Sequence, residues 1–136
     1  MAITIQAVDV HSKRDIARFL HLPWRIYVTP DGTRDPQWVP PFLPDQRSLL
    51  HPDKNPYHQH SRTQLFLALQ DATVIGRIAA SVDDNFNTFW QANVGFFGWL
   101  ECVDDLAVAQ ALFQAAEQFL QAEGMTSAGA CQFHLE

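Results

Sequence analysis

The sequence predicts one domain of the α+β or α/β class, with a mixed, largely antiparallel sheet flanked by helices. Three apolar runs follow one another between residues 64 and 101, with turn residues between them, which is typical of antiparallel strands. Two stretches, 13–22 and 106–120, carry apolar residues at helical spacing. The chain has 136 residues, of which 47% are hydrophobic and 18% charged, a composition that favours one globular core over residues 1–136.

The chain is expected to open with a strand and a helix. Ile3, Ile5 and Ala7 alternate with other residues, which places them on one face of a strand. Ser12 is a favourable N-cap for the helical run 13–22. Pro23 is expected to mark either a first helical turn or a break, because proline lacks a backbone N–H, and residues 24–28 then continue as a short packed segment.

Residues 30–56 hold seven of the eight prolines and predict an irregular arm. Apolar residues in this arm, among them Trp38 and Phe42, are anchors that a disordered linker would lack, so we expect it to be folded. Pro44 and Asp45 are typical of a helix start, which predicts a short helix through Leu50.

Strand signals follow the arm. Residues 64–69 and 74–82 flank a short turn and predict a hairpin, residues 83–88 have turn chemistry, and residues 92–101 predict a third strand. Asp104 and Asp105 then precede the amphipathic helix, which Gly124 ends. The last apolar run, 128–133, predicts a strand parallel to the third one, connected by a helical crossover.

Composition excludes several classes of function. The net charge of −6 disfavours nucleic-acid binding, which needs a basic surface. The first residues resemble neither a signal peptide nor a membrane anchor, so we expect a cytoplasmic protein that does not insert into a membrane. Cys102 and Cys131 predict free thiols. His51, Asp53, His58 and His60 lie close in sequence, but without a cysteine among them they favour structural histidines, and no metal site is predicted.

Six segments of the chain resemble an uncharacterised bacterial group of GNAT-type N-acetyltransferases, over about residues 10 to 126. These segments are LPWRIYV (22–28), DPQWVPPF (35–42), HPDKNPYHQHS (51–61), IGRIAA (75–80), VGFFGWLE (94–101) and AEQFLQAEGM (116–125). The resemblance implies transfer of an acetyl group from acetyl-CoA to an amine acceptor of unknown identity.

The resemblance also implies where the site lies. The backbone of the third strand would hold the pantetheine arm of the cofactor as an added strand, which gives six cofactor-binding residues: Val94, Gly95, Phe96, Phe97, Gly98 and Trp99. Gly95 and Gly98 fit that interpretation, although they equally suit close packing of Trp90 or Trp99.

Catalytic residues follow from the same resemblance. Glu101, at the exit of that strand, is the candidate general base. Tyr27 and Tyr57 are candidates for the acid that protonates the leaving thiolate, and Trp38 and Phe42 of the arm are candidate substrate-binding residues on the acceptor side.

Two departures from the GNAT pattern favour an alternative. The turn that should bind the CoA diphosphate lacks glycine and carries Glu101, Asp104 and Asp105, and like charges disfavour an anion there. The C-terminal strands that complete a GNAT sheet are expected to be missing, which predicts a homo-oligomer through an exposed sheet edge. The alternative is therefore a catalytically inactive ligand-binding or homodimerisation module.

Overall fold

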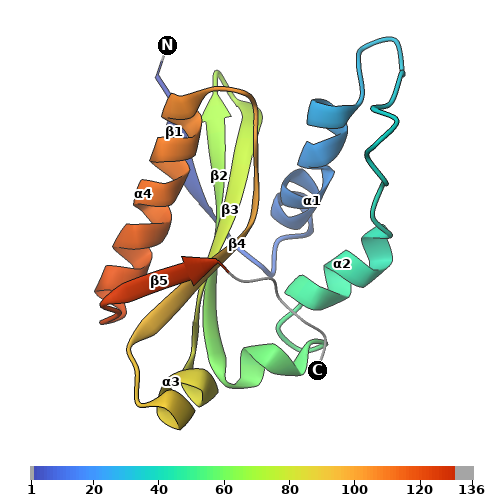
Figure 1. Cartoon of the computed structure of the whole chain (residues 1–136). Helices are drawn as coiled ribbons and strands as arrows, with labels where there is room; N and C mark the ends of the chain where they lie inside the picture. The colour runs from blue at the N-terminus through green and yellow to red at the C-terminus, as the bar shows by residue number, and fades with distance from the viewer. Residues whose placement is uncertain (1, 131–136) are drawn as a thin grey trace.

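The structure is a computed structural model that describes residues 2–130. Its elements, labelled in Figure 1 where there is room, are β1 (Thr4–Val8), α1 (Lys13–Tyr27), α2 (Leu43–Leu50), the 3-10 helix η1 (Pro56–Gln59), β2 (Ser61–Gln70), β3 (Thr73–Asp83), α3 (Asp84–Trp90), β4 (Val94–Cys102), α4 (Leu106–Ala122) and β5 (Ser127–Ala130). Within residues 2–130, no helix is both long and apolar enough to cross a membrane.

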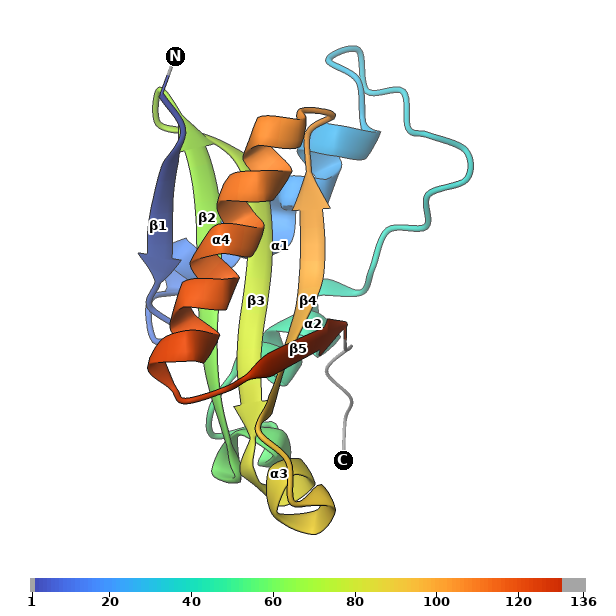
Figure 2. The ribbon, with the colours of Figure 1, turned by 60° about the vertical axis from the view of Figure 1, so that its left-hand side comes forward.

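The five strands form one mixed sheet in the order β1-β2-β3-β4-β5. The first three pairings are antiparallel and the pairing of β4 with β5 is parallel. Helix α4 covers one face of the sheet, and α1 and α2 cover the other (Figures 1 and 2). Both the predicted fold class and the parallel last strand are confirmed.

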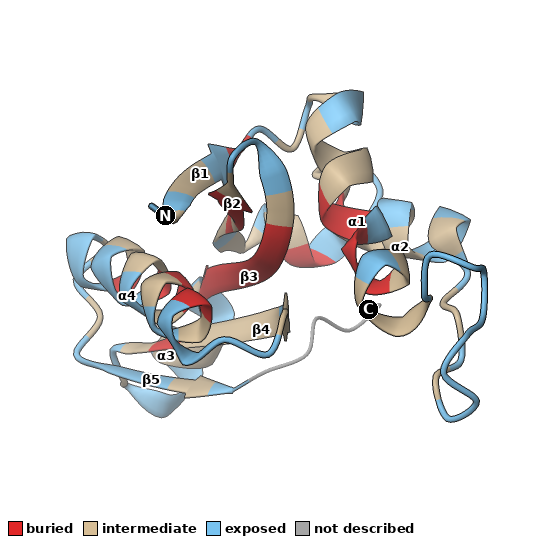
Figure 3. Cartoon of the chain, turned by 90° about the horizontal axis from the view of Figure 1, so that it is seen from above, coloured by how far each residue is buried: buried red, intermediate tan, exposed pale blue. Residues whose placement is uncertain are grey.

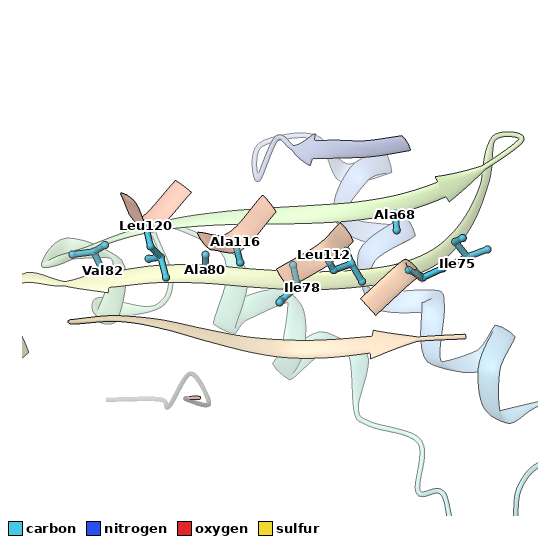
Figure 4. Packing of buried hydrophobic residues seen from close by; sticks show 9 residues of the cluster. Ala68, Ile75, Ile78, Ala80, Val82, Leu112, Ala116 and Leu120 are labelled. Atoms are coloured by element: carbon cyan, nitrogen blue, oxygen red, sulfur yellow. The ribbon is translucent and has the colours of Figure 1, made fainter. Parts of the chain in front are cut away.

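The sheet buries both of its faces, and the view from above places the buried part of β3 between α4 and α1 (Figure 3). On the α4 face, Ile78 and Val82 of β3 pack with Leu112 and Leu120 (Figure 4). On the α1 face a second cluster forms around Phe19, with Leu20, Leu50, Leu65 and Leu67. Each fully buried side chain of this size contributes about 1.5–3 kcal/mol relative to an exposed one. The two clusters hold both helical layers against one sheet.

Helix α1 passes through Pro23 and ends only at Tyr27, so the expectation that Pro23 marks a first turn or a break was wrong. A proline inside a helix leaves the carbonyl oxygen four residues earlier without its N–H donor, and here that oxygen belongs to Phe19. The guanidinium of Arg77, in β3, donates to it from 2.8 Å. A strand side chain thus supplies the hydrogen bond that the proline removes, and the helix continues for another turn.

Strand β4 contains a bulge between Gly98 and Glu101. Arg77 pairs with Glu101 and Ala79 pairs with Gly98, so β4 has one residue more than β3 between these two pairs. Trp99, inside this stretch, has φ of 58°, in the left-handed region that non-glycine residues rarely adopt. The bulge redirects the strand between the two pairs.

The remaining local predictions were mostly confirmed. The arm is irregular up to α2, which begins at Leu43 with a proline in its first turn. The 83–88 segment is instead part of a short helix, α3, because Asp83 caps it by accepting from two backbone N–H groups. Residues 131–133, the end of the predicted last strand, lie outside the described residues.

Candidate functional site

A cavity opens beside the second half of β4. Its volume is about 430 Å³, and it is lined by Arg77, Phe97, Gly98, Trp99, Leu100, Glu101 and Ala130. Within the described residues, the parallel ladder between β4 and β5 pairs Val94–Phe97 with Ser127–Ala130. Strand β4 continues from Gly98 to Cys102 along the cavity.

This geometry narrows the six predicted cofactor-binding residues. Val94, Gly95, Phe96 and Phe97 each have a partner in β5, so their backbone on that side is already used within the sheet. Gly98 and Trp99 line the cavity. An added strand therefore does not fit on that side of the first four residues.

Gly95 has a different structural role from the predicted ones. A Cβ at this position would collide with the side chain of Leu120 of α4. The glycine therefore makes room for the helix that covers this face. Neither of the tryptophans named as alternatives explains it.

Glu101 and Tyr27 form a hydrogen-bonded pair at the edge of the cavity. The Tyr27 hydroxyl donates to the Glu101 carboxylate at 2.8 Å, although the residues are 74 positions apart. The ring of Tyr27 stacks on Trp38, with centroids 5.2 Å apart and planes 15° from parallel. The end of α1, the arm and β4 thus meet at this point, which brings together three of the residues named from the sequence.

The carboxylate environment affects the Tyr27 phenol. Its pKa is raised, first by the hydrogen bond to Glu101, then by burial and by the negative charges of Glu101 and Asp35. Tyr27 is therefore protonated at neutral pH. The thiol of Cys102 has a raised pKa as well, mainly through burial, which keeps it in the unreactive thiol form.

Arg77 supports the cavity from inside the sheet. It is 5% exposed, and its guanidinium lies over the rings of Phe19 and Trp99, with Cζ 5.1 and 5.3 Å from the centroids. Its Nε donates to the carbonyl oxygen of Trp99 at 3.0 Å. Burial lowers its pKa to about 10, while Glu101 and Tyr27 raise it, so it is charged at neutral pH. Arg77 thereby fixes the bulge of β4 to the body of α1.

Sequence reasoning missed Arg77, although a signal was present. It is the one charged residue within the apolar run VIGRIAASV of residues 74–82. A charged side chain within a strand that is buried on both faces needs specific partners, because an unpaired buried charge is costly. Neither of its carbonyl acceptors is recognisable from sequence, since both depend on the packing of α1 and β4 against β3.

The structure does not bring Tyr57 and Phe42 to this pair. Tyr57 is 7% exposed, and its hydroxyl forms a hydrogen bond with Ser81. Ser81 lies four residues beyond Arg77 on β3, roughly 13 Å along the strand. Phe42 is 67% exposed and does not line the cavity. Of the two candidate acids, Tyr27 is the one next to Glu101.

The start of α4 is capped by a carboxylate from the chain itself. Asp105 is the N-cap, and its side chain accepts a hydrogen bond from the N–H of Ala107 at 3.0 Å. Free N–H groups at a helix N-terminus are what a bound diphosphate uses. The predicted weakness of this anion site thus has a concrete basis, because Asp105 takes one of these donors.

The clustered histidines make separate hydrogen bonds. His58 contacts the carbonyl oxygen of Leu49 at 2.9 Å, and His60 contacts Asp83 at 3.0 Å. His51 Nδ1 accepts from the N–H of Asp53. Over residues 2–130, no group of three or more His, Cys, Asp or Glu residues is placed to hold a metal ion.

Two curated proteins resemble the chain in sequence. It is 34% identical over 125 residues to the bacterial ceramide synthase of Caulobacter vibrioides, covering 91% of this chain and 31% of that protein. It is also 34% identical over 113 residues to protein YghO of Escherichia coli K12, covering 83% of this chain and 27% of that protein. The chain thus spans less than a third of the length of either protein. No protein-family profile matches it.

Solved structures of acetyltransferases resemble it in fold. A tandem GNAT protein from the clavulanic acid biosynthesis pathway matches with a TM-score of 0.69 at 14% identity, over 95% of this chain and 36% of that one. An aminoglycoside acetyltransferase from a soil metagenome, solved with sisomicin, matches with a TM-score of 0.63 at 12% identity, over 96% of this chain and 77% of that one. The aminoglycoside acetyltransferase AAC(6')-Iy, solved with a CoA bisubstrate analogue, matches with a TM-score of 0.60 at 14% identity, over 97% of this chain and 80% of that one. The chain therefore has the GNAT-like fold that its sequence segments predicted.

Proposed function

We propose that the chain is an acyltransferase domain that moves an acyl group from acetyl-CoA, or from a related acyl thioester, to an amine. The observation that carries this proposal is the Glu101–Tyr27 pair at 2.8 Å, beside a cavity that β4 borders. Base, acid and a site for an extended thioester arm then lie within one small region. The acetyltransferase structures with the same fold support the proposal.

The residues divide the chemistry as follows. Glu101 accepts a proton from the amine, and the amine nitrogen then attacks the thioester carbonyl carbon as a nucleophile. The C–N bond forms and the C–S bond breaks. The backbone N–H groups of β4 beside the cavity are the candidates for stabilising the negative charge on the carbonyl oxygen. Tyr27, protonated at neutral pH, supplies the proton that the leaving thiolate takes.

The name of one relative suggests the type of bond formed. A ceramide is an amide of a fatty acid and a long-chain amine, so a ceramide synthase joins an acyl group to an amine. Aminoglycosides, the substrates named for two of the structures, are amines as well. We therefore propose that this chain catalyses N-acylation, as the names of these proteins indicate for them, and that its acceptor is an amine.

The cavity suits one part of an acyl-CoA, the pantetheine arm, whereas the N-terminus of α4 does not suit the diphosphate. The cavity beside Gly98 fits the pantetheine arm, which would add along β4. The N-terminus of α4 does not fit the diphosphate, because Asp105 caps it and Asp104 adds a second carboxylate. The proposal therefore predicts weak binding of the donor, governed by its thioester arm.

The direct test is product formation by the purified chain. Acetyl-CoA and a long-chain acyl-CoA are each incubated with simple and long-chain primary amines, and free CoA and amide are measured by mass spectrometry. Amide formation that Glu101→Gln reduces at least tenfold would support the proposal. Equal rates for the wild type and Glu101→Gln, or no amide with any pair, would reject it.

The carboxylate cap of α4 favours a second candidate, a GNAT-like module that binds a ligand or a second copy without catalysis. In the described residues the sheet has two outer strands, β1 and β5, and an outer strand can offer backbone groups to another chain. Calorimetric titration with acetyl-CoA and the mass in solution distinguish the candidates. No heat at millimolar acetyl-CoA together with a dimer mass favours the module. A monomer mass rejects its dimer form.

A further inference from the structure

A second cavity, of about 480 Å³, lies between the start of α1 and the end of α2. Its lining combines four apolar residues with five basic ones: Val10, Ile16, Ala17 and Leu50, and His11, Lys13, Arg47, His51 and Lys54. Volumes of 300–1,000 Å³ with an apolar lining and a few polar groups are typical of small-molecule sites. None of the lining residues carries a carboxylate.

The charge of this cavity contrasts with the charge of the chain. The whole chain has a net charge of −6 and only nine Lys and Arg residues, and three of the nine line this one cavity. Within residues 2–130, Lys13, Arg47 and Lys54 form no ion pair, whereas Arg18 and Arg62 each pair with a carboxylate. Three cations that form no ion pair within residues 2–130 thus line this cavity.

Two acidic residues near the start of α1 make contacts of their own. Asp15 lies 3.7 Å from Arg18 and accepts from the N–H of Asp9. Asp9 in turn accepts from the N–H of His11 at 2.9 Å. Asp53 donates its N–H to His51 Nδ1, which places the remaining ring proton of His51 on Nε2 as a donor. Asp9 and Asp15 thus make contacts other than with the lysines or the arginine of the cavity.

The base of the cavity belongs to the hydrophobic core. Leu50 is 1% exposed, and it packs in the cluster that contains Phe19, with Val10 and Ile16 at its edge. A ligand that covers the half-buried Val10 and Ile16 gains from burying apolar surface, and its charged end meets the lysines and the arginine. The start of α1, with its helix dipole, adds to the positive potential.

We propose that this cavity binds a small phosphate monoester whose apolar group rests on Val10 and Ile16. Two lysines and one arginine suit a dianion better than a monoanion, because a guanidinium matches phosphate oxygens in a bidentate manner and ammonium groups add point charges. The site is separate from the Glu101–Tyr27 pair. Lys13 and Tyr27 lie at opposite ends of α1, which puts roughly 20 Å between them.

Hexyl phosphate is a suitable probe, titrated calorimetrically into the full chain at low salt. We expect it to bind at least tenfold more tightly than inorganic phosphate, because only the ester covers Val10 and Ile16. Lys54→Gln and Lys13→Gln should each weaken its binding about three- to tenfold. Arg14→Gln is the matched control, since Arg14 is exposed beside Lys13 and does not line the cavity.

A cavity-filling variant tests the apolar part. Ala17→Leu adds three carbons to the wall and should weaken hexyl phosphate while leaving inorganic phosphate unchanged. The proposal fails if hexyl phosphate binds no better than inorganic phosphate, if hexyltrimethylammonium binds equally well, or if Arg14→Gln weakens binding as much as Lys54→Gln. Because acyl transfer is not part of the readout, this result is independent of the proposed function.

Discussion

Arg77 donates a hydrogen bond, Nη1 to oxygen at 2.8 Å, to the Phe19 carbonyl that Pro23 leaves without a helical donor. The same guanidinium bonds the carbonyl oxygen of Trp99 in the bulge of β4. One buried side chain therefore joins an irregularity in α1 to an irregularity in β4. The two ends of this link belong to the same two elements as Tyr27 and Glu101.

We expect Arg77→Met to destabilise the protein by about 2–4 kcal/mol, because two buried carbonyl oxygens lose their donor. Urea denaturation measures this change. Pro23→Ala restores an N–H for Phe19 and should recover about 1 kcal/mol of the loss in the double variant. Strictly additive effects of the two substitutions would show that Arg77 does not compensate for Pro23.

Glu101→Gln should lower kcat/KM for acyl transfer by about 10²–10⁴-fold if Glu101 is the general base. The amide still offers an oxygen to the Tyr27 hydroxyl, so the free energy of unfolding should change little. Amide formation by mass spectrometry and urea denaturation are measured on the same samples. A loss of stability in proportion to the loss of activity would argue for a structural role instead.

Tyr27 should ionise at higher pH in the wild type than in Glu101→Gln, because the carboxylate raises its pKa. The pKa of Tyr27 is higher in the folded state than in the unfolded chain, so the protonated phenol stabilises the folded state fully below about pH 10. This stabilisation of the fold is lost as the pH rises through the raised pKa of Tyr27. The measurement is the phenolate absorbance difference between each protein and its Tyr27→Phe variant. Identical midpoints for the wild type and Glu101→Gln would contradict the effect of the carboxylate on the phenol.

Asp105→Ser should strengthen binding of acetyl-CoA several-fold. Serine is as good an N-cap as aspartate, so the helix keeps its cap while the site loses one negative charge. Asp105→Ala loses the charge and the cap, and should destabilise the protein by about 1 kcal/mol. Calorimetric titration and thermal unfolding separate the two effects. Unchanged acetyl-CoA binding in Asp105→Ser would mean that this carboxylate does not face the donor.

Gly95→Ala should destabilise the fold by about 1–3 kcal/mol, because the new methyl group meets Leu120 within the core between β4 and α4. Gly129→Ala is the control on the neighbouring strand, where the nearest atom to the added Cβ is Phe96 Cδ1 at 4.0 Å. Chemical denaturation of both variants gives the comparison. Similar losses for the two would indicate a general preference for glycine rather than a collision with Leu120.

Much of the fold was predictable because its signals are local. Apolar runs separated by turn residues mark β2 and β3, and helical spacing with an aspartate cap marks α4. Asp83 shows the limit of such reasoning, because its turn chemistry was recognised but its role as the cap of α3 was not. A short helix and a turn share the same residues, and the hydrogen bonds that follow decide between them.

The candidate site was only partly predictable. Glu101 was identified by its place after an apolar strand, and Trp38 by its place on the arm. Their link through Tyr27 joins residues far apart in the chain and follows from how α1 and β4 pack on the sheet. Tyr27 and Tyr57 were equivalent candidates in the sequence. In the structure Tyr57 is buried and forms a hydrogen bond with Ser81, whereas Tyr27 contacts Glu101.

The sequence by itself determined the order of the strands and of helices α1, α2 and α4, the apolar stripe of α4 and the carboxylates at its start, because each depends on neighbours within a few residues. Only the tertiary structure decided that α1 continues through Pro23, that β4 bulges at Trp99, and that Arg77 joins the two. The physical reason is that a missing helical hydrogen bond and a strained backbone persist only where a partner from another element stabilises them.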